Sequence, residues 1–136
     1  MHIPQLRILL VEDHPFQLLA TRCLLTTFGF TQLALAENAG QAIALMAQSA
    51  KPFDILLCDQ CLPDLTGLEL IVIASRQCAI HHAILLSGLP LPELKDLEAQ
   101  ATRLELPLLG YLSKPLNREG LYALIHPLFA PTTHCP

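Results

Sequence analysis

Residues 54–67 read DILLCDQCLPDLTG, and this stretch contains the signals that decide the fold. The apolar run from Asp54 to Cys58 is typical of a strand that a parallel sheet buries on both faces. A loop containing proline and glycine then predicts a break before a helix from Leu68 to Arg76. The sequence therefore predicts that Asp59 lies at the carboxyl end of a buried strand.

The same alternation of short apolar runs with helical patterns extends in both directions along the chain. Further strands are predicted from Leu6 to Val11, Thr31 to Ala36, Ala83 to Leu86 and Leu108 to Leu112. Further helices are predicted from Pro15 to Gly29, from a cap at Asn38 to about Ala50, from Pro92 to Leu104, and from a cap at Asn117 to about Ile125. Five β/α units predict an α/β fold with helices on both faces of a doubly wound parallel sheet.

Composition bounds the classes of protein that the chain can be. It has 136 residues, of which 52% are hydrophobic, so it is long enough for one domain with its own core. We expect that domain to span residues 1–128. Residues 129–136 are rich in proline and threonine, which predicts a disordered tail or the start of a linker.

Charge and hydropathy exclude several partners. With 8 Lys and Arg against 12 Asp and Glu, the net charge of -4 argues against direct binding of nucleic acid, which needs many basic contacts to phosphates. No apolar run approaches the length of a membrane span, and the first residues do not form a secretory signal. We therefore expect a cytoplasmic protein without a membrane partner.

Five cysteines occur, and two of them, Cys58 and Cys61, form a C-x-x-C. Most of the cysteines sit in apolar runs, where a reduced thiol packs as a small hydrophobic group. A redox pair or half of a zinc site is the alternative, although a second C-x-x-C or a nearby Cys/His pair is missing. We interpret Cys58 as the buried end of a strand.

Polar residues stand at the carboxyl ends of four predicted strands. Glu12 and Asp13 end the first strand, Asp59 the third, Ser87 the fourth and Lys114 the fifth. In an open parallel sheet these ends form the edge where ligands bind. Clustered carboxylates need a cation among them, and oxygen ligands favour Mg²⁺, or Mn²⁺ in its place. The pattern indicates a phosphoryl-transfer site at this edge.

These residues resemble the receiver domain of two-component response regulators, which has the CheY-like fold. The matching features, in chain order, are the acidic pair Glu12-Asp13, the D-x-x-L-P-x-x-x-G motif of residues 59–67, Ser87-Gly88 and Lys114-Pro115. The resemblance covers nearly the whole chain. It implies a flavodoxin-like sheet with strand order 2-1-3-4-5.

The resemblance also implies a reaction and its metal ligands. Asp59 would be the phosphoacceptor for a sensor histidine kinase or a phosphotransfer protein. Magnesium would be held by Asp13, Asp59 and the backbone carbonyl of Cys61, with Glu12 acting through water. The chain would catalyse only its own phosphorylation and dephosphorylation, so it is expected to be a switch without substrate turnover.

Three further roles follow from the resemblance. Lys114 would pair with Asp59 before transfer and with the phosphoryl group after it, while Ser87 and Tyr111 would form the conformational switch. The output surface would be the fourth helix, fifth strand and fifth helix, at about residues 92–128, through which a homodimer could form. The chain could act alone as a single-domain regulator, or it could be the receiver of a longer protein with a fused output domain, either DNA-binding or a cyclic-di-GMP phosphodiesterase.

One departure from the family and two alternative functions remain open. Ser87 and Lys114 are 27 positions apart, which is longer than in minimal receivers, so the fourth helix or its flanking loops must be extended. The chain could be a pseudo-receiver that acts as an interaction module without phosphorylation. A Mg²⁺-dependent phosphatase of the haloacid dehalogenase type is less favoured, because that family needs a second aspartate at the position of Cys61.

Overall fold

The computed structural model describes residues 5–128, which form a five-stranded parallel sheet with the strand order β2-β1-β3-β4-β5. The strands are β1 (Arg7–Val11), β2 (Gln32–Ala36), β3 (Phe53–Asp59), β4 (Ile80–Leu86) and β5 (Leu108–Leu112). The helices are α1 (Pro15–Thr27), α2 (Ala39–Gln48), α3 (Gly67–Arg76), α4 (Leu91–Arg103) and α5 (Arg118–Ile125), followed by a short 3-10 turn at His126–Leu128. The predicted fold class and strand order are confirmed.

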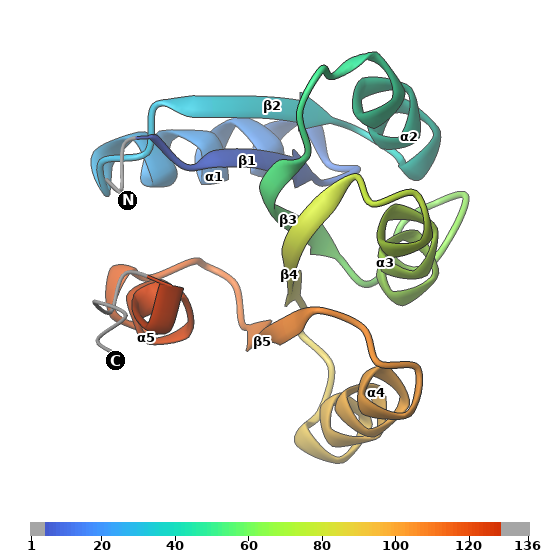
Figure 1. Cartoon of the computed structure of the whole chain (residues 1–136). Helices are drawn as coiled ribbons and strands as arrows, with labels where there is room; N and C mark the ends of the chain where they lie inside the picture. Colours follow the sequence, from blue (N-terminus) through green and yellow to red (C-terminus); the bar gives the residue numbers. More distant parts are fainter. Residues whose placement is uncertain (1–4, 129–136) are drawn as a thin grey trace, which may run out of the picture.

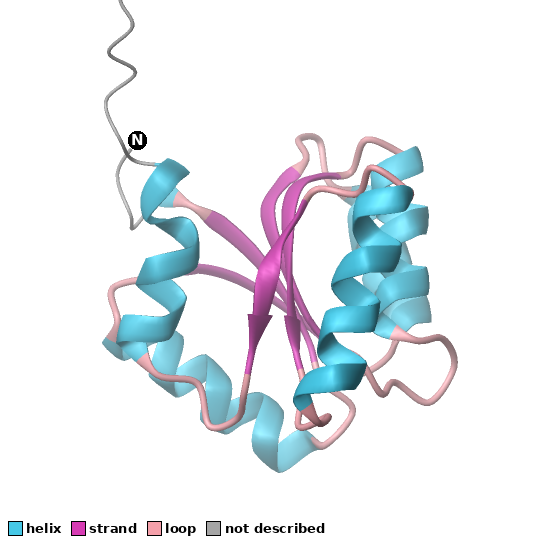
Figure 2. Ribbon diagram, turned by 90° about the horizontal axis from the view of Figure 1, so that it is seen from below, coloured by secondary structure: helices cyan, strands magenta, loops and turns pink. Residues whose placement is uncertain are grey.

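Helices cover both faces of the sheet, with α1 and α5 on one side and α2, α3 and α4 on the other (Figure 1). Figure 2 shows the resulting three layers, with the strands in the middle. Successive strand residues alternate between the two cores, so Leu56 packs on the α2 and α3 side and Leu57 on the α1 and α5 side. Both are fully buried, which is why the strands have almost continuous apolar sequences.

Side-chain caps set the start of three helices. The Asn38 side chain accepts a hydrogen bond from the Gln41 amide, and Asn117 accepts one from the Gly120 amide, as predicted for both caps. Thr66 and Glu69 form a reciprocal capping box at the start of α3. A Thr followed three residues later by Glu is a known signature of such a box.

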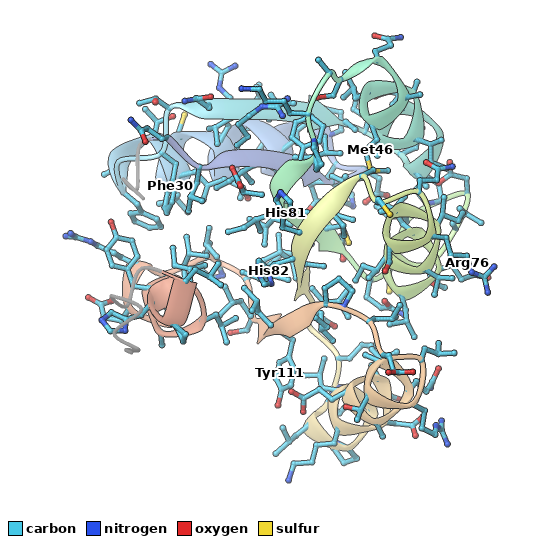
Figure 3. The ribbon with its side chains drawn as sticks, viewed as in Figure 1. Phe30, Met46, Arg76, His81, His82 and Tyr111 are labelled. Atoms are coloured by element: carbon cyan, nitrogen blue, oxygen red, sulfur yellow. The ribbon has the colours of Figure 1, made fainter. Side chains whose placement is uncertain are left out.

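The largest difference from the predicted boundaries is at the start of β4, and the other boundaries agree to within two residues. Strand β4 begins at Ile80, three residues before the predicted start, because Ile80 pairs with Phe53 and His82 pairs with Ile55 of β3. The two histidines of this end, labelled in Figure 3, interrupt the apolar pattern because His81 is exposed and His82 half-buried. Helix α1 ends at Thr27, two residues before the predicted Gly29, and α4 ends at Arg103 rather than Leu104.

Helix α5 is fixed against the residues that follow the C-terminal end of α1. The Tyr122 hydroxyl donates a 2.7 Å hydrogen bond to the carbonyl of Phe28, and its ring meets Phe30 edge-on. This contact holds the chain segment after Lys114 against the connection between α1 and β2.

Among the helices within residues 5–128, none is long and apolar enough to cross a membrane. The predicted tail at residues 129–136 lies outside the described residues.

Candidate functional site

Three carboxylates meet at the carboxyl ends of β1 and β3. Val11 pairs with Cys58, so the next residues along each strand, Glu12 and Asp59, lie side by side. One carboxylate oxygen from each of Glu12, Asp13 and Asp59 lies within 4.8 Å of the others. This convergence is the one expected from the charged residues at the strand ends.

Lys114 connects these carboxylates to the end of β5. Its Nζ donates hydrogen bonds of 2.8 Å to Asp59 Oδ2 and 2.8 Å to Glu12 Oε1. A third, longer bond of 3.3 Å reaches Oε1 of Gln17 in the first turn of α1. The three donors of the ammonium therefore each have an acceptor. Its pairing with Asp59 agrees with the arrangement predicted before phosphoryl transfer.

Burial controls the electrostatics of this cluster. The Glu12 side chain is 0% exposed, and burial raises its pKa although the hydrogen bond from Lys114 opposes the rise. For Lys114, burial lowers the pKa, but the hydrogen bonds to Asp59 and Glu12 outweigh that effect and raise it overall. The ammonium accordingly stays charged across the neutral range.

The donor set fits a divalent cation. Three carboxylates and one ammonium leave two net negative charges at the site, and a divalent ion neutralises these. All the side-chain ligands are oxygen atoms, which Mg²⁺ and Mn²⁺ prefer. Among residues 5–128, no other group of three His, Cys, Asp or Glu side chains is close enough to hold a metal. Asp13 is half-buried and therefore reachable from solvent.

Ser87 and Tyr111 lie on the neighbouring strands. Ser87 follows Leu86, which pairs with Asp59, and it is only 3% exposed. Its Oγ accepts a 3.0 Å hydrogen bond from the Leu89 amide within its own loop. Tyr111 is half-buried in β5, and Figure 3 shows its side chain on the side of α4. Ser87 therefore directly follows β4 beside Asp59, and Tyr111 lies in the adjacent strand β5, where it pairs with Leu85.

The loop between β3 and α3 is fixed at its base by Gln60, which the sequence analysis did not identify. The Gln60 carbonyl accepts a 2.9 Å hydrogen bond from the Gly67 amide, and its Oε1 accepts one of 3.0 Å from Leu68. The Cys61 amide donates a 3.3 Å hydrogen bond to Asp59 Oδ1. The base of the loop thus orients Asp59 and the residue whose carbonyl is a predicted metal ligand.

Gln17 and Asp64 were also missed as contributors to this region. Gln17 approaches Lys114 from α1. Asp64 lies in the loop between β3 and α3, and its carboxylate accepts hydrogen bonds from the amides of Ala39 and Gly40 at the start of α2. Nothing in the local sequence indicates either contact, because each joins segments that only the fold brings together.

The C-x-x-C does not form a chemical pair. Cys58 is 0% exposed and its Sγ donates a weak hydrogen bond to the Gly67 carbonyl at 3.9 Å, whereas Cys61 is exposed on the loop. Both are free thiols, and neither belongs to a potential metal group within residues 5–128. The prediction of Cys58 as the buried end of a strand is confirmed.

Cys58 is expected to resist alkylation in the folded protein. Burial raises the pKa of its thiol far above the ordinary value, and the negative charge of Asp59 adds to the rise. Because the thiolate is the nucleophile, iodoacetamide at pH 8 should label Cys61 and leave Cys58 unmodified. Peptide mass mapping measures both in one sample, and urea should make Cys58 reactive. Labelling of Cys58 at the rate of Cys61 without urea would show that this strand end is not buried.

Comparison with known proteins identifies relatives of this arrangement. The sequence matches the family described as response regulator receiver domain over residues 8–126. Similar solved structures include the signal receiver domain of an HD domain-containing protein from Pseudomonas fluorescens, at 29% identity and a TM-score of 0.72, over 91% of this chain and 94% of that chain.

Two further similar structures come from other organisms. A CheY-like response regulator receiver domain protein from Methanospirillum hungatei has 25% identity and a TM-score of 0.70, over 90% of this chain and 92% of that chain. The signal receiver domain of a modulated diguanylate cyclase from Desulfovibrio desulfuricans has 25% identity and a TM-score of 0.69, over 88% of this chain and 89% of that chain. No curated protein sequence gives a significant match.

Proposed function

The chain belongs to the response regulator receiver domain family, and we propose that Asp59 accepts a phosphoryl group from the phosphohistidine of a sensor histidine kinase or a phosphotransfer protein. The observation that carries this proposal is the ammonium of Lys114, 2.8 Å from both Asp59 and the buried Glu12. A lysine shared by two carboxylates balances part of their charge and orients Asp59, and a carboxylate is the nucleophile that the reaction needs.

The transfer exchanges one bond to phosphorus for another. A carboxylate oxygen of Asp59 forms the new bond to phosphorus while the bond between phosphorus and the imidazole nitrogen breaks, and the imidazole takes up one proton. Lys114 then exchanges its hydrogen bond to Asp59 for one to a phosphoryl oxygen. Positioning and charge neutralisation are the main contributions that a protein makes to phosphoryl transfer.

Asp13, Asp59 and the Cys61 carbonyl would hold a magnesium or manganese ion, with Glu12 bound through water. When bound, this ion supplies positive charge that stabilises the phosphoryl oxygens. The chain's own contribution is to bring the three carboxylates together from β1 and β3 and to balance part of their charge with Lys114.

Phosphorylation would act on the rest of the domain through Ser87 and Tyr111. The Ser87 hydroxyl, whose oxygen accepts a hydrogen bond from the Leu89 amide, would turn to donate one to a phosphoryl oxygen, because a hydrogen bond to a charged acceptor is the stronger of the two. Tyr111 would then move inward from its position beside α4. The surface of α4, β5 and α5 would change as a result, with a homodimer or a fused output domain as the responding element.

For the output domain, we propose only its functional class. The similar receivers come from an HD domain-containing protein and from a diguanylate cyclase, which favours a fused signalling domain, including the predicted cyclic-di-GMP phosphodiesterase. A DNA-binding output remains the second class. The extended segment between Ser87 and Lys114 contains the 13-residue helix α4, so the output surface has a long exposed helix. The cytoplasmic location stays a prediction.

Phosphorylation by a small donor tests the proposal. The protein is incubated with Mg²⁺ and acetyl phosphate and its intact mass is measured, with Asp59→Asn as the control. We expect the mass to increase by one phosphoryl group in the wild type alone, and only without a chelator. If the folded wild type gains mass neither from acetyl phosphate nor from a phosphohistidine donor, the result would support the pseudo-receiver alternative. Continuous release of phosphate from monoesters would support the phosphatase.

A further inference from the structure

Asp64 joins the loop of the phosphorylation site to a helix that begins far away in the sequence. Its two carboxylate oxygens accept hydrogen bonds from the amides of Ala39 at 3.0 Å and Gly40 at 2.9 Å. These are the first two residues of α2. A helix N-terminus offers free amides and a positive dipole end, so it favours a carboxylate at this place.

This contact is not needed to complete the cap of α2. Asn38 already occupies the cap position, and its side chain accepts a 2.8 Å hydrogen bond from the Gln41 amide. Asp64 binds two other amides and comes from the loop after β3. The same carboxylate also accepts a 3.1 Å hydrogen bond from Leu65 within the loop. Asp64 therefore fixes the outer part of the loop to α2.

The rest of the loop is held at its base and by two apolar side chains, Leu62 and Leu65, which pack against the core on the α2 and α3 side. Cys61 and Thr66 form an isolated antiparallel bridge across it, and Gln60 and Gly67 are hydrogen-bonded below that bridge. Cys61 is exposed, so core packing reaches its carbonyl only through the half-buried Leu62. The position of the Cys61 carbonyl thus depends on how both the base and the outer part of the loop are restrained.

We propose that Asp64 is a positioning residue for the metal site, because its contact with the N-terminus of α2 holds the loop that carries the Cys61 carbonyl. This inference rests on the proposed function, in which that carbonyl is a metal ligand. The backbone hydrogen bonds lower the pKa of Asp64, so the contact persists through the neutral range. Partners that orient a ligand commonly change metal affinity about 10–100-fold when they are removed.

Metal binding by three variants tests this role without measuring phosphorylation. The dissociation constant for Mn²⁺ is measured by electron paramagnetic resonance for the wild type, Asp64→Ala, Asp64→Asn and Asn38→Ala. We expect Asp64→Ala to weaken binding about tenfold. Asp64→Asn removes the same charge but keeps an acceptor oxygen, so it should retain part of the affinity. Asn38→Ala removes the true cap of α2 and should leave the affinity unchanged.

The outcomes separate the inference from the function on which it rests. The positioning role would be overturned if Asp64→Ala bound Mn²⁺ as tightly as the wild type. It would also be overturned if either Asn38→Ala or Asp64→Asn lost as much affinity as Asp64→Ala. If Asp64→Ala does not fold, the Mn²⁺ affinity of Asp64→Asn tests the positioning role in its place. An affinity of Asp64→Asn equal to that of the wild type would overturn the role. A wild type that binds no Mn²⁺ would contradict the proposed metal site itself.

Discussion

Replacing Lys114 by methionine is expected to slow phosphorylation of Asp59 by acetyl phosphate at least about a hundredfold, because charge-stabilising donors in active sites commonly contribute 10²–10³ in rate. The ammonium is 2.8 Å from Asp59 and would also neutralise the transferred phosphoryl group. Methionine keeps the length of the apolar stem but has no charge. The rate is measured from the intact mass as a function of time.

Lys95→Met is the matched control. Lys95 lies on α4, is exposed, and takes part in neither of the site's two ion pairs. We expect it to be phosphorylated at the wild-type rate. A Lys114→Met protein that is phosphorylated as fast as this control would show that the ion pair has no role in transfer.

The same variant should also change the dependence of stability on pH. Without Lys114, the fully buried Glu12 loses its partner, so its pKa in the folded state rises further above the value in the unfolded chain. A carboxyl whose pKa is raised in the folded state destabilises the fold as pH rises above its pKa in the unfolded chain, and the loss is complete once the pH passes the raised pKa. The difference in unfolding free energy between wild type and variant should therefore be smallest near pH 4 and grow toward neutral pH, measured by urea denaturation without metal.

Gly67→Ala is expected to lower the free energy of unfolding by about 2 kcal/mol or more, because overpacking a rigid site costs about 1–3 kcal/mol. A Cβ at Gly67 would lie 2.6 Å from the Asp59 carbonyl oxygen, 2.8 Å from Leu85 Cδ2 and 3.0 Å from the Gln60 Cα. Two of these atoms belong to the backbone and cannot rotate away. The peptide that carries Asp59 must shift, so phosphorylation should also be impaired.

Gly88→Ala provides the comparison for this substitution. It adds the same methyl group in the neighbouring loop, and no atom lies within 4 Å of the new Cβ. Urea denaturation should show a small change for Gly88→Ala and a large one for Gly67→Ala. Equal stabilities of the two variants would mean that α3 does not approach the end of β3 as closely as described.

The positions of Asp59 and Lys114 could be predicted because both residues end or follow buried strands. An apolar run that ends in a charged residue fixes both the strand and its carboxyl end, and this placed Asp59 and Lys114 at one edge of the sheet. The start of β4 was predicted incorrectly because His81 and His82 are polar residues at the more exposed end of a central strand. Local hydropathy does not show that a polar residue pairs with a neighbouring strand.

The contacts of Gln17 and Asp64 could not be predicted from the sequence. Lys114 and Gln17 are 97 residues apart, and Asp64 lies 25 residues after Ala39. Each contact depends on where a helix begins relative to the sheet edge, which hydrophobic patterning does not specify. An exposed glutamine or aspartate in such a segment also has the composition of an ordinary solvated loop.

Locating the phosphoryl group on the chain tests the central claim most directly. The phosphorylated protein is reduced with borohydride, which converts an aspartyl phosphate to homoserine, and the peptides are then sequenced by mass spectrometry. We predict homoserine at position 59 and unmodified aspartate at position 13. Modification at Asp13, at a histidine, or at no residue of a protein that had gained phosphoryl mass would contradict the assignment of Asp59 as the phosphoacceptor.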